Sequence, residues 1–326
     1  MGRLVDGKWV TEREWNNTDG RFKRAESAFR NWVTADGSPG PGGEGGFVAA
    51  PGRYHLYVAT ACPWAHRTLV FRKLKKLENI VSVSVVDPDM DEDGWKFTDD
   101  LPDHLFGAQR LSEIYVRARP DATTRVTVPV LWDKESGTIV SNESSEIIRM
   151  FNSAFDGVGA DASLDLYPAE LRDAIEAINP IVYDTVNNGV YKSGFAGTQD
   201  AYEEAVTALF ETLDMLDARL GRQRYLAGDR ITEADWRLFT TLVRFDAVYV
   251  THFKCNIRRI ADYANLSNYL RELYQWPGVA ATVDMPAIKR HYFFSHRSIN
   301  PKGIVPLGPD LDLDSPHDRD TVRAAA

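Results

Sequence analysis

The chain has 326 residues, 44% of them hydrophobic and 26% charged, an ordinary balance for a globular protein that is long enough for two domains. A formal net charge of −9 argues against nucleic acid or an anionic membrane as the main partner. Two cysteines exclude a disulfide scaffold, and the sequence shows neither a signal peptide nor an apolar run of membrane-spanning length, so we expect a cytoplasmic protein.

Residues 1–50 are expected to form an N-terminal extension. Residues 20–24 (GRFKR), together with Phe29 and Trp32, mix aromatic and basic side chains, and residues 37–43 read as a flexible loop rich in glycine and proline. The mixed segment is either a docking segment, part of a site mouth, or a means of holding the extension against its own domain. We favour the last interpretation.

Cys62 lies where a strand ends and a helix begins. Residues 54–58 alternate and favour a strand, whereas apolar residues recur at helical spacing from 69 to 77. Pro63 then occupies the first helical position, which proline favours. The free N–H groups at that helix end stabilise a thiolate, so Cys62 is a candidate nucleophile. The alternative, a buried structural cysteine, is the commoner fate of the residue type.

The residue three positions after Cys62 is Ala65, so the motif cannot close an internal disulfide as a pair of cysteines would. The other cysteine, Cys255, lies far along the chain, and we do not expect it to bridge to Cys62. A disulfide at Cys62 is therefore expected with a small external thiol, of which glutathione is the obvious candidate.

The segment after this helix completes a βαβ unit that begins with the strand at residues 54–58, and a hairpin and a helix follow, which is the thioredoxin-like pattern. The expected order is strand, insertion, strand, strand and helix, over residues 80–86, 87–125, 127–132, 138–140 and 144–155. The insertion is too long for an ordinary loop, and such loops are usually functional. It carries Trp95 in an acidic, polar run.

Two features near the predicted hairpin could bind a peptide-like ligand. Pro129 is anomalous within a central strand, and a cis Val128–Pro129 bond would turn the backbone of Val128 outward for pairing; an ordinary edge-strand proline is the alternative. Glu143 and Ser144 open the next helix. Simple capping explains them, and a carboxylate and free donors there could also hold a ligand ammonium and carboxylate.

From Tyr167 onward only helical patterns remain. Helices are expected over residues 168–190, 202–220, 236–250, 263–275 and 284–295. The histidines and cysteines show no metal-ligand spacing, so no metal is expected. We therefore predict α/β plus all-α architecture, with an extension (1–50), a thioredoxin-like domain (51–160), an all-helical domain (161–296) and an extended or disordered tail (297–326).

This combination resembles a cytosolic glutathione transferase. Four longer stretches are similar to the glutathionyl-hydroquinone reductases, the Xi class: residues 62–67 (CPWAHR), 125–133 (RVTVPVLWD), 188–196 (NGVYKSGFA) and 244–250 (RFDAVYV). The resemblance covers residues from about 15 to about 300. It implies a homodimer that uses glutathione as co-substrate and acts on glutathionyl-hydroquinones.

The resemblance also implies roles for individual residues. Cys62 would be the nucleophile, Tyr191 the proton donor, and Tyr249 and Tyr292 the hydroxyls that favour the thiolate. The glutathione site would comprise Trp95, the backbone of Arg125, Val126, Thr127 and Val128, and Glu143 with Ser144. From the residues alone, a helical tyrosine is more often packing than chemistry.

The expected reaction is reduction of a glutathionyl-hydroquinone through a mixed disulfide between Cys62 and glutathione, with release of oxidised glutathione. One alternative is an omega-like thiol transferase or dehydroascorbate reductase, which shares Cys62 and does not need Tyr191 as an acid. A second is a non-catalytic module that binds partners through its helical half.

Overall fold

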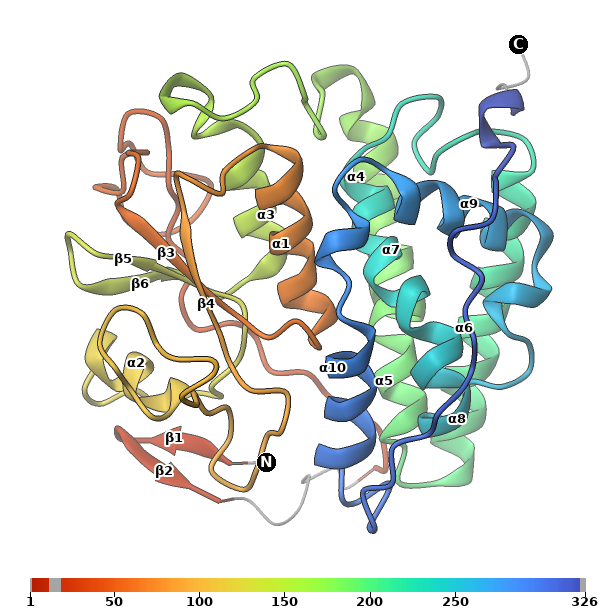
Figure 1. The fold of residues 1–326 in the computed structure, drawn as a ribbon, viewed down its shortest axis with the longest axis horizontal. Coiled ribbons are helices and arrows are strands. Elements are labelled where there is room, and N and C mark those ends of the chain that lie inside the picture. Colours follow the sequence, from red (N-terminus) through yellow and green to blue (C-terminus); the bar gives the residue numbers. More distant parts are fainter. Residues whose placement is uncertain (1, 12–18, 323–326) are drawn as a thin grey trace. The chain divides into compact units, whose positions relative to one another are not determined.

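The computed structural model describes residues 2–11 and 19–322 (Figure 1). Met1, residues 12–18 and residues 323–326, parts of the predicted extension and tail, lie outside the described residues. The chain divides into two compact units. Among the described residues, unit 1 comprises 2–11, 25–164 and 282–296, and unit 2 comprises 19–24, 165–281 and 297–322.

Unit 1 is built on a four-stranded sheet in the order β4-β3-β5-β6. Its strands and the two helices that follow them are β3 (Tyr54–Val58), α1 (Pro63–Leu74), β4 (Ser82–Val85), β5 (Val130–Asp133), β6 (Thr138–Ser141) and α3 (Ser144–Ser153). The β3–β4 pair is parallel and needs α1 as its crossover, whereas β5 and β6 follow as an antiparallel hairpin. Helices α1 and α3 pack side by side next to the sheet (Figure 1). The predicted thioredoxin-like pattern is confirmed.

A second, two-stranded sheet and a helix in the insertion were not predicted. Strands β1 (Arg3–Val5) and β2 (Lys8–Val10) form a hairpin through Asp6 and Gly7, both at positive φ, and an Asp-Gly pair is a strong hairpin signal. Helix α2 (Leu111–Ala118) begins where the carboxylate of Glu113 accepts the backbone N–H of Arg110 at 2.8 Å.

Residues of the extension run beside β6. The backbone N–H of Asn31 donates to the carbonyl of Val140 at 2.9 Å, and the carbonyl of Phe29 accepts from Asn142 at 3.1 Å. This part of the extension is therefore held by the sheet edge of unit 1.

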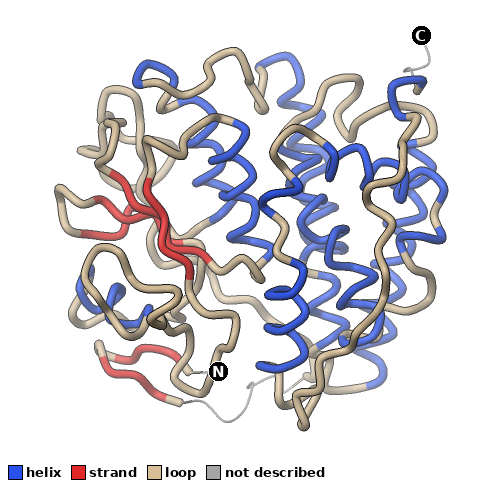
Figure 2. The backbone as a smooth tube through the Cα atoms, in the orientation of Figure 1, coloured by secondary structure: helices blue, strands red, loops and turns tan. Residues whose placement is uncertain are grey.

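Unit 2 contains no strand among its described residues (Figure 2). Its main helical segments are α4 (Arg172–Ile181), η3 (Val182–Asn187), α5 (Gly189–Gly194), α6 (Gln199–Leu220), α7 (Glu233–Arg244), η4 (Phe245–Tyr249), α8 (Val250–His252) and α9 (Ala264–Gln275). Short 3-10 turns lie at η1 (Asp156–Val158) in unit 1 and, in or at the edge of unit 2, at η2 (Ala169–Leu171), η5 (Ile260–Asp262), η6 (Ala280–Thr282) and η8 (Arg319–Thr321). Helix α7 begins with a capping box of Thr232 and Asp235, both fully buried.

The two units depart from the predicted domain ranges in several places. Residues 282–296, called the return segment below, pack with unit 1 and form α10 (Met285–Arg290) and η7 (His291–Ser295). A bidentate ion pair between Arg290 and Asp89 is one reason, because it joins the segment to the insertion with both N···O distances at 2.6 Å. Residues 19–24 of the extension pack with unit 2.

The described part of the tail, residues 297–322, also packs with unit 2. Arg319 is fully buried there and donates to the carbonyls of Leu220 at 2.6 Å and Gln223 at 2.9 Å. Across the described part of the chain, no helix is both long and apolar enough to cross a membrane.

Candidate active site

Cys62 is the N-cap residue of α1, in an extended conformation with φ −78° and ψ 123°. Pro63 occupies the first turn, and the Cys62 carbonyl accepts the N–H of His66 at 2.9 Å, which starts the helix. The thiol is part-exposed. It therefore lies at the positive end of a three-turn helix, the environment that favours a thiolate.

The loop before β5 lies opposite this thiol. The Cys62 Sγ is 3.7 Å from the carbonyl oxygen of Val128, and the Val128–Pro129 peptide bond is cis. Of the two interpretations of Pro129, the cis bond is the one that the structure has. Arg125, Val126 and Thr127 precede it, each partly exposed. Because β5 begins at Val130, Thr127 lies in a loop and not, as predicted, at the start of the strand.

Glu143 caps α3. Its carboxylate accepts the backbone N–H of Ser145 at 3.0 Å and hydroxyl hydrogens from Ser145 at 2.9 Å and Ser27 at 3.0 Å. Burial acts to raise the pKa of Glu143, but these hydrogen bonds, with the charge of Arg67, outweigh it and lower the pKa. Arg67 also donates to the hydroxyl of the neighbouring Ser144 at 3.4 Å. An ionised carboxylate at this place can accept a ligand ammonium.

Trp95 lies in the insertion and is buried against the return segment. Its ring stacks on His291, with centroids 4.8 Å apart and planes at 21°. The Nδ1 of His291 is hydrogen-bonded to the carbonyl of Pro88 at 2.9 Å, which fixes the imidazole. The ring of Tyr292 also contacts His291, edge-on and with the centroids 5.4 Å apart. Two predicted site residues from distant parts of the sequence, Trp95 and Tyr292, therefore share one neighbour.

The return segment also reaches the elements on either side of the candidate nucleophile. Asp284 accepts a hydrogen bond from the hydroxyl of Thr60 at 3.3 Å, and the hydroxyl of Thr282 is 2.8 Å from the Nε2 of His66. These bonds tie the segment to the residues before and within the start of α1.

Tyr191 and Tyr249 belong to unit 2, in an aromatic cluster on α5 and η4. Their ring centroids are 6.4 Å apart, and both rings contact Phe253, at 5.4 Å and 5.5 Å. Phe22 from the extension also stacks on Tyr191, at 6.1 Å. Arg24 contacts the same tyrosine, with its guanidinium carbon 4.9 Å from the ring centroid of Tyr191. Its Nε donates a hydrogen bond to the Oδ1 of Asn188 at 3.0 Å.

The extension is thus divided between the units. Phe29 and Trp32 pack with unit 1, whereas Phe22 and Arg24 pack with unit 2 beside Tyr191. The expectation that the whole mixed segment holds the extension against its own domain is wrong for residues 20–24. The alternation of basic and aromatic residues was the signal, but a sequence does not say which unit such a segment contacts.

Cys255 is fully buried in unit 2, and its Sγ donates to the carbonyl of Phe253 at 3.8 Å. Burial raises the pKa of this thiol to about 12, although a hydrogen bond with Ser193 opposes the shift. Cys62 and Cys255 are both free thiols, as expected. No group of three or more histidine, cysteine, aspartate or glutamate side chains among the described residues is placed to hold a metal ion.

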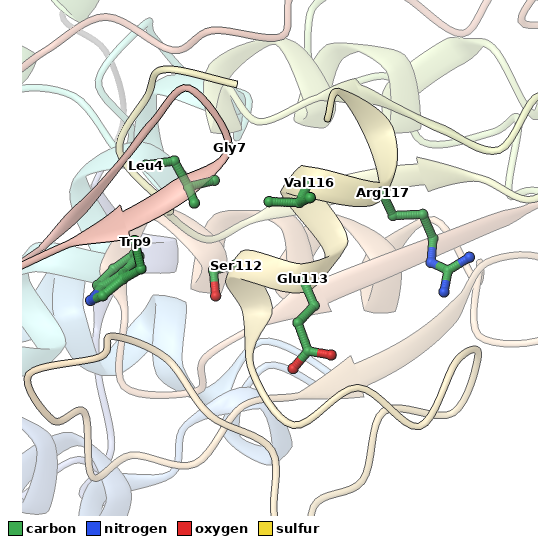
Figure 3. A pocket seen from close by; sticks show the side chains of 7 residues that line it. All are labelled: Leu4, Gly7, Trp9, Ser112, Glu113, Val116 and Arg117. Atoms are coloured by element: carbon green, nitrogen blue, oxygen red, sulfur yellow. The ribbon is translucent and has the colours of Figure 1, made fainter. Parts of the chain in front are cut away.

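A pocket of about 480 Å³ opens between the N-terminal hairpin and α2 (Figure 3). It is lined by Leu4, Gly7, Trp9, Ser112, Glu113, Val116 and Arg117. None of the predicted site residues lines it. In Figure 3, Val116 of α2 points toward Leu4 and Gly7 of the hairpin, whereas Tyr115 of the same helix is buried.

Comparison with known proteins gives matches along nearly the whole chain. Residues 61–154 match the glutathione S-transferase N-terminal domain family, and residues 199–272 match the C-terminal domain family. Glutathionyl-hydroquinone reductase YqjG of Escherichia coli (strain K12) is 58% identical over 98% of this chain and 99% of its own length. Glutathionyl-hydroquinone reductase PcpF of Sphingobium chlorophenolicum is 53% identical over 96% of this chain and 98% of its own.

Two solved structures are similar throughout. The glutathione-bound structure of YqjG has a TM-score of 0.90 at 56% identity, covering 98% of this chain and 99% of that one. A Xi class glutathione transferase from Natrialba magadii has a TM-score of 0.91 at 51% identity, covering 100% and 98%.

Proposed function

Because this chain belongs to the glutathionyl-hydroquinone reductases, the Xi class of the glutathione transferases, we propose that it reduces glutathionyl-hydroquinones to hydroquinones with glutathione as the reductant. The observation that carries the proposal is the part-exposed Cys62 at the N-terminus of α1, with its Sγ 3.7 Å from the carbonyl of Val128.

In the first half of the proposed reaction, the Cys62 thiolate attacks the glutathionyl sulfur of the substrate. A sulfur–sulfur bond forms and the bond between sulfur and the ring carbon breaks. The electron pair of the broken bond goes to the ring carbon, a very poor leaving group unless it is protonated or the phenol first becomes a ketone. Tyr191 supplies that proton, so the ring is reduced as the two sulfurs are oxidised.

In the second half, the thiolate of a second glutathione attacks the glutathionyl sulfur of the mixed disulfide. Glutathione disulfide forms and Cys62 leaves as a thiolate, ready for another cycle. Because the residue three positions after Cys62 is Ala65, no neighbouring thiol competes for the mixed disulfide.

The remaining predicted residues divide into two groups in this proposal. Tyr249 and Tyr292 stabilise the Cys62 thiolate through their hydroxyls. The binding site for the glutathionyl moiety is made by Trp95, the backbone of Arg125, Val126, Thr127 and Val128, and Glu143 with Ser144. The ionised state of Glu143 supports a role in holding the γ-glutamyl ammonium.

The experiment supplies glutathionyl-hydroquinone and glutathione to the purified protein and measures hydroquinone and glutathione disulfide. Equal amounts of the two products are expected. Cys62→Ser should abolish their formation and Cys255→Ser should leave it nearly unchanged, since Cys255 is buried. Hydroquinone formed without glutathione disulfide, or equal losses in the two variants, would contradict the proposal.

The homodimeric state that the family resemblance implies and the cytoplasmic location expected from the sequence belong to the same proposal. Sedimentation velocity tests the first and fractionation of cells tests the second. A sedimentation coefficient that fits one 36.6 kDa chain would remove the dimer from the proposal.

A further inference from the structure

The loop that precedes β5 depends on a side chain from outside the sheet. Thr127 lies outside the strand, which begins at Val130, so its peptide groups do not join the ladder. Its N–H donates to the hydroxyl oxygen of Tyr115 at 3.2 Å, and the same hydroxyl donates to the Thr127 carbonyl at 2.9 Å. One phenol therefore satisfies both backbone polar groups of this residue.

The third bonding position of that hydroxyl is also used. A phenol has one hydrogen to donate and accepts at two lone pairs, and the Asn142 Nδ2 donates to it at 3.1 Å. The orientation of Asn142 is set in turn by its Oδ1, which accepts the backbone N–H of Phe29 at 3.0 Å. The hydroxyl thus connects the insertion, the loop and the start of α3 with the extension.

Tyr115 remains a phenol under ordinary conditions. It is fully buried, and burial raises its pKa although hydrogen bonds with Thr127 and Asn142 oppose the shift. Its ring is fixed as well, since Phe29 meets it edge-on at 5.8 Å and 78°. Because its side chain is not exposed, Tyr115 can affect the binding of a ligand only through the loop that it holds in place.

We propose that Tyr115 is a positioning residue for glutathione, because its hydroxyl fixes the backbone of Thr127 and with it Val128, whose carbonyl faces Cys62. This inference rests on the proposed function, in which the loop of residues 125–128 lies against the glutathionyl moiety and Val128 pairs with it. It assigns to the long insertion a role in the site besides that of Trp95. Without the Tyr115 hydroxyl, the loop would bind glutathione less tightly. The Cys62 thiol at the N-terminus of α1 would keep its surroundings.

The test is Tyr115→Phe, which keeps the ring and removes only the hydroxyl. The N–H and carbonyl of Thr127, both part-buried, then lose their partner, and we expect the KM for glutathione and for glutathionyl-hydroquinone to rise by roughly five- to thirty-fold. The pH midpoint of Cys62 alkylation should stay within about 0.3 pH units, because the terminus of α1 is untouched.

Tyr54→Phe is the matched control. Tyr54 is also fully buried in unit 1, and its hydroxyl donates to the Val48 carbonyl at 2.8 Å. Loss of the Tyr54 hydroxyl should change both KM values by no more than about two-fold. It should lower the stability of the fold by an amount comparable to that lost in Tyr115→Phe. Equal KM changes in the two variants, or none in Tyr115→Phe, would overturn the inference.

Should Tyr115→Phe not fold, Asn142→Ala removes one bond to the same hydroxyl and should raise both KM values by a smaller factor. Unchanged KM values in that variant would count against Tyr115. A parent protein that neither binds glutathione nor consumes glutathionyl-hydroquinone would instead refute the proposed function, so the two failures are distinguishable.

Discussion

Arg24 places its guanidinium carbon 4.9 Å from the ring centroid of Tyr191, and its Nε donates to Asn188 at 3.0 Å, one turn before that tyrosine. A cation beside the ring stabilises the negative charge that remains on Tyr191 once the proton has moved to the substrate. The extension thereby supplies a charged neighbour to the proposed acid.

Arg24→Met keeps most of the side-chain volume and removes the charge. We expect kcat on glutathionyl-hydroquinone to fall by roughly three- to thirty-fold, in line with a cation–π contact of about 0.5–2 kcal/mol, with partial recovery in Arg24→Lys. Arg21→Met is the matched control, because Arg21 lies in the same segment and pairs with the exposed Glu204 at 2.6 Å. A similar fall in both variants would show that the segment matters only for packing.

The two cysteines should react very differently with an alkylating agent. Cys62 is part-exposed at a helix terminus, and we expect its alkylation midpoint well below the free-thiol value of about 8.5. Burial raises the pKa of Cys255 to about 12, so this thiol stays protonated as pH rises to neutral and beyond. Peptide mass spectrometry after iodoacetamide pulses across a pH series measures both. A midpoint at or above the free value would remove the activated-thiolate mechanism.

Tyr191→Phe separates carbon–sulfur from sulfur–sulfur cleavage. Breaking the bond to the ring requires a proton, whereas a mixed disulfide releases a thiolate that is stable without one. We expect activity on glutathionyl-hydroquinone to fall by roughly a hundred- to ten-thousand-fold, and activity on a small glutathione mixed disulfide to change only a few-fold.

Tyr202→Phe is a control for this change, since it removes another hydroxyl of unit 2, bonded to the Lys254 carbonyl at 2.7 Å. Parallel losses on both substrates in Tyr191→Phe would mean that Tyr191 positions glutathione or supports the fold. No loss on either would assign the proton to another group.

The central strand should open more easily in acid because of His55. Burial lowers its pKa to about 4, and both ring nitrogens are hydrogen-bonded, to Ser82 at 2.7 Å and to Ser84 at 2.9 Å. In the unfolded chain the pKa of this histidine is about 6.5, so below that pH His55 is protonated in the unfolded chain while it stays neutral in the folded chain. Stability is therefore lost as pH falls from about 6.5 toward 4.

At about 1.4 kcal/mol per pH unit, His55 should make the opening free energy of β3 roughly 2 kcal/mol lower at pH 5 than at pH 7. Hydrogen exchange of the β3 amides measures this opening. His55→Gln should lower protection at neutral pH and reduce the difference between the two pH values. An unchanged difference would show that other groups carry the acid sensitivity.

The parts of the fold that could be predicted are those with a regular apolar period. Residues 54–58, the helix after Cys62 and the long helix ending at Leu220 are close to β3, α1 and α6. The Asp6-Gly7 pair is an equally clear signal for a turn. The hairpin around it was not predicted, because each of its strands has only three residues.

Contacts between distant segments could not be predicted in the same way. Tyr115 and His291 look like ordinary packing residues of amphipathic segments, and only the folded chain brings them to Thr127 and Trp95. The helix predicted over residues 284–295 is present. Helical periodicity identifies the apolar face of a helix, however, and does not indicate which unit that face packs against. The roles given to Tyr191, Tyr249 and Tyr292 came from the family resemblance, and they stay predictions.

The return segment has a consequence for how the molecule is made. Unit 1 uses residues 282–296, which the ribosome adds only after almost all of unit 2. A nascent chain therefore cannot complete the surroundings of Cys62 and Trp95 while the helical half is still being synthesised, because Asp284, Thr282 and His291 have not emerged. A fragment that ends at residue 164 should accordingly carry the thiol without the neighbours that the return segment supplies. An exchange of the first 164 residues between relatives should require exchange of residues 282–296 as well.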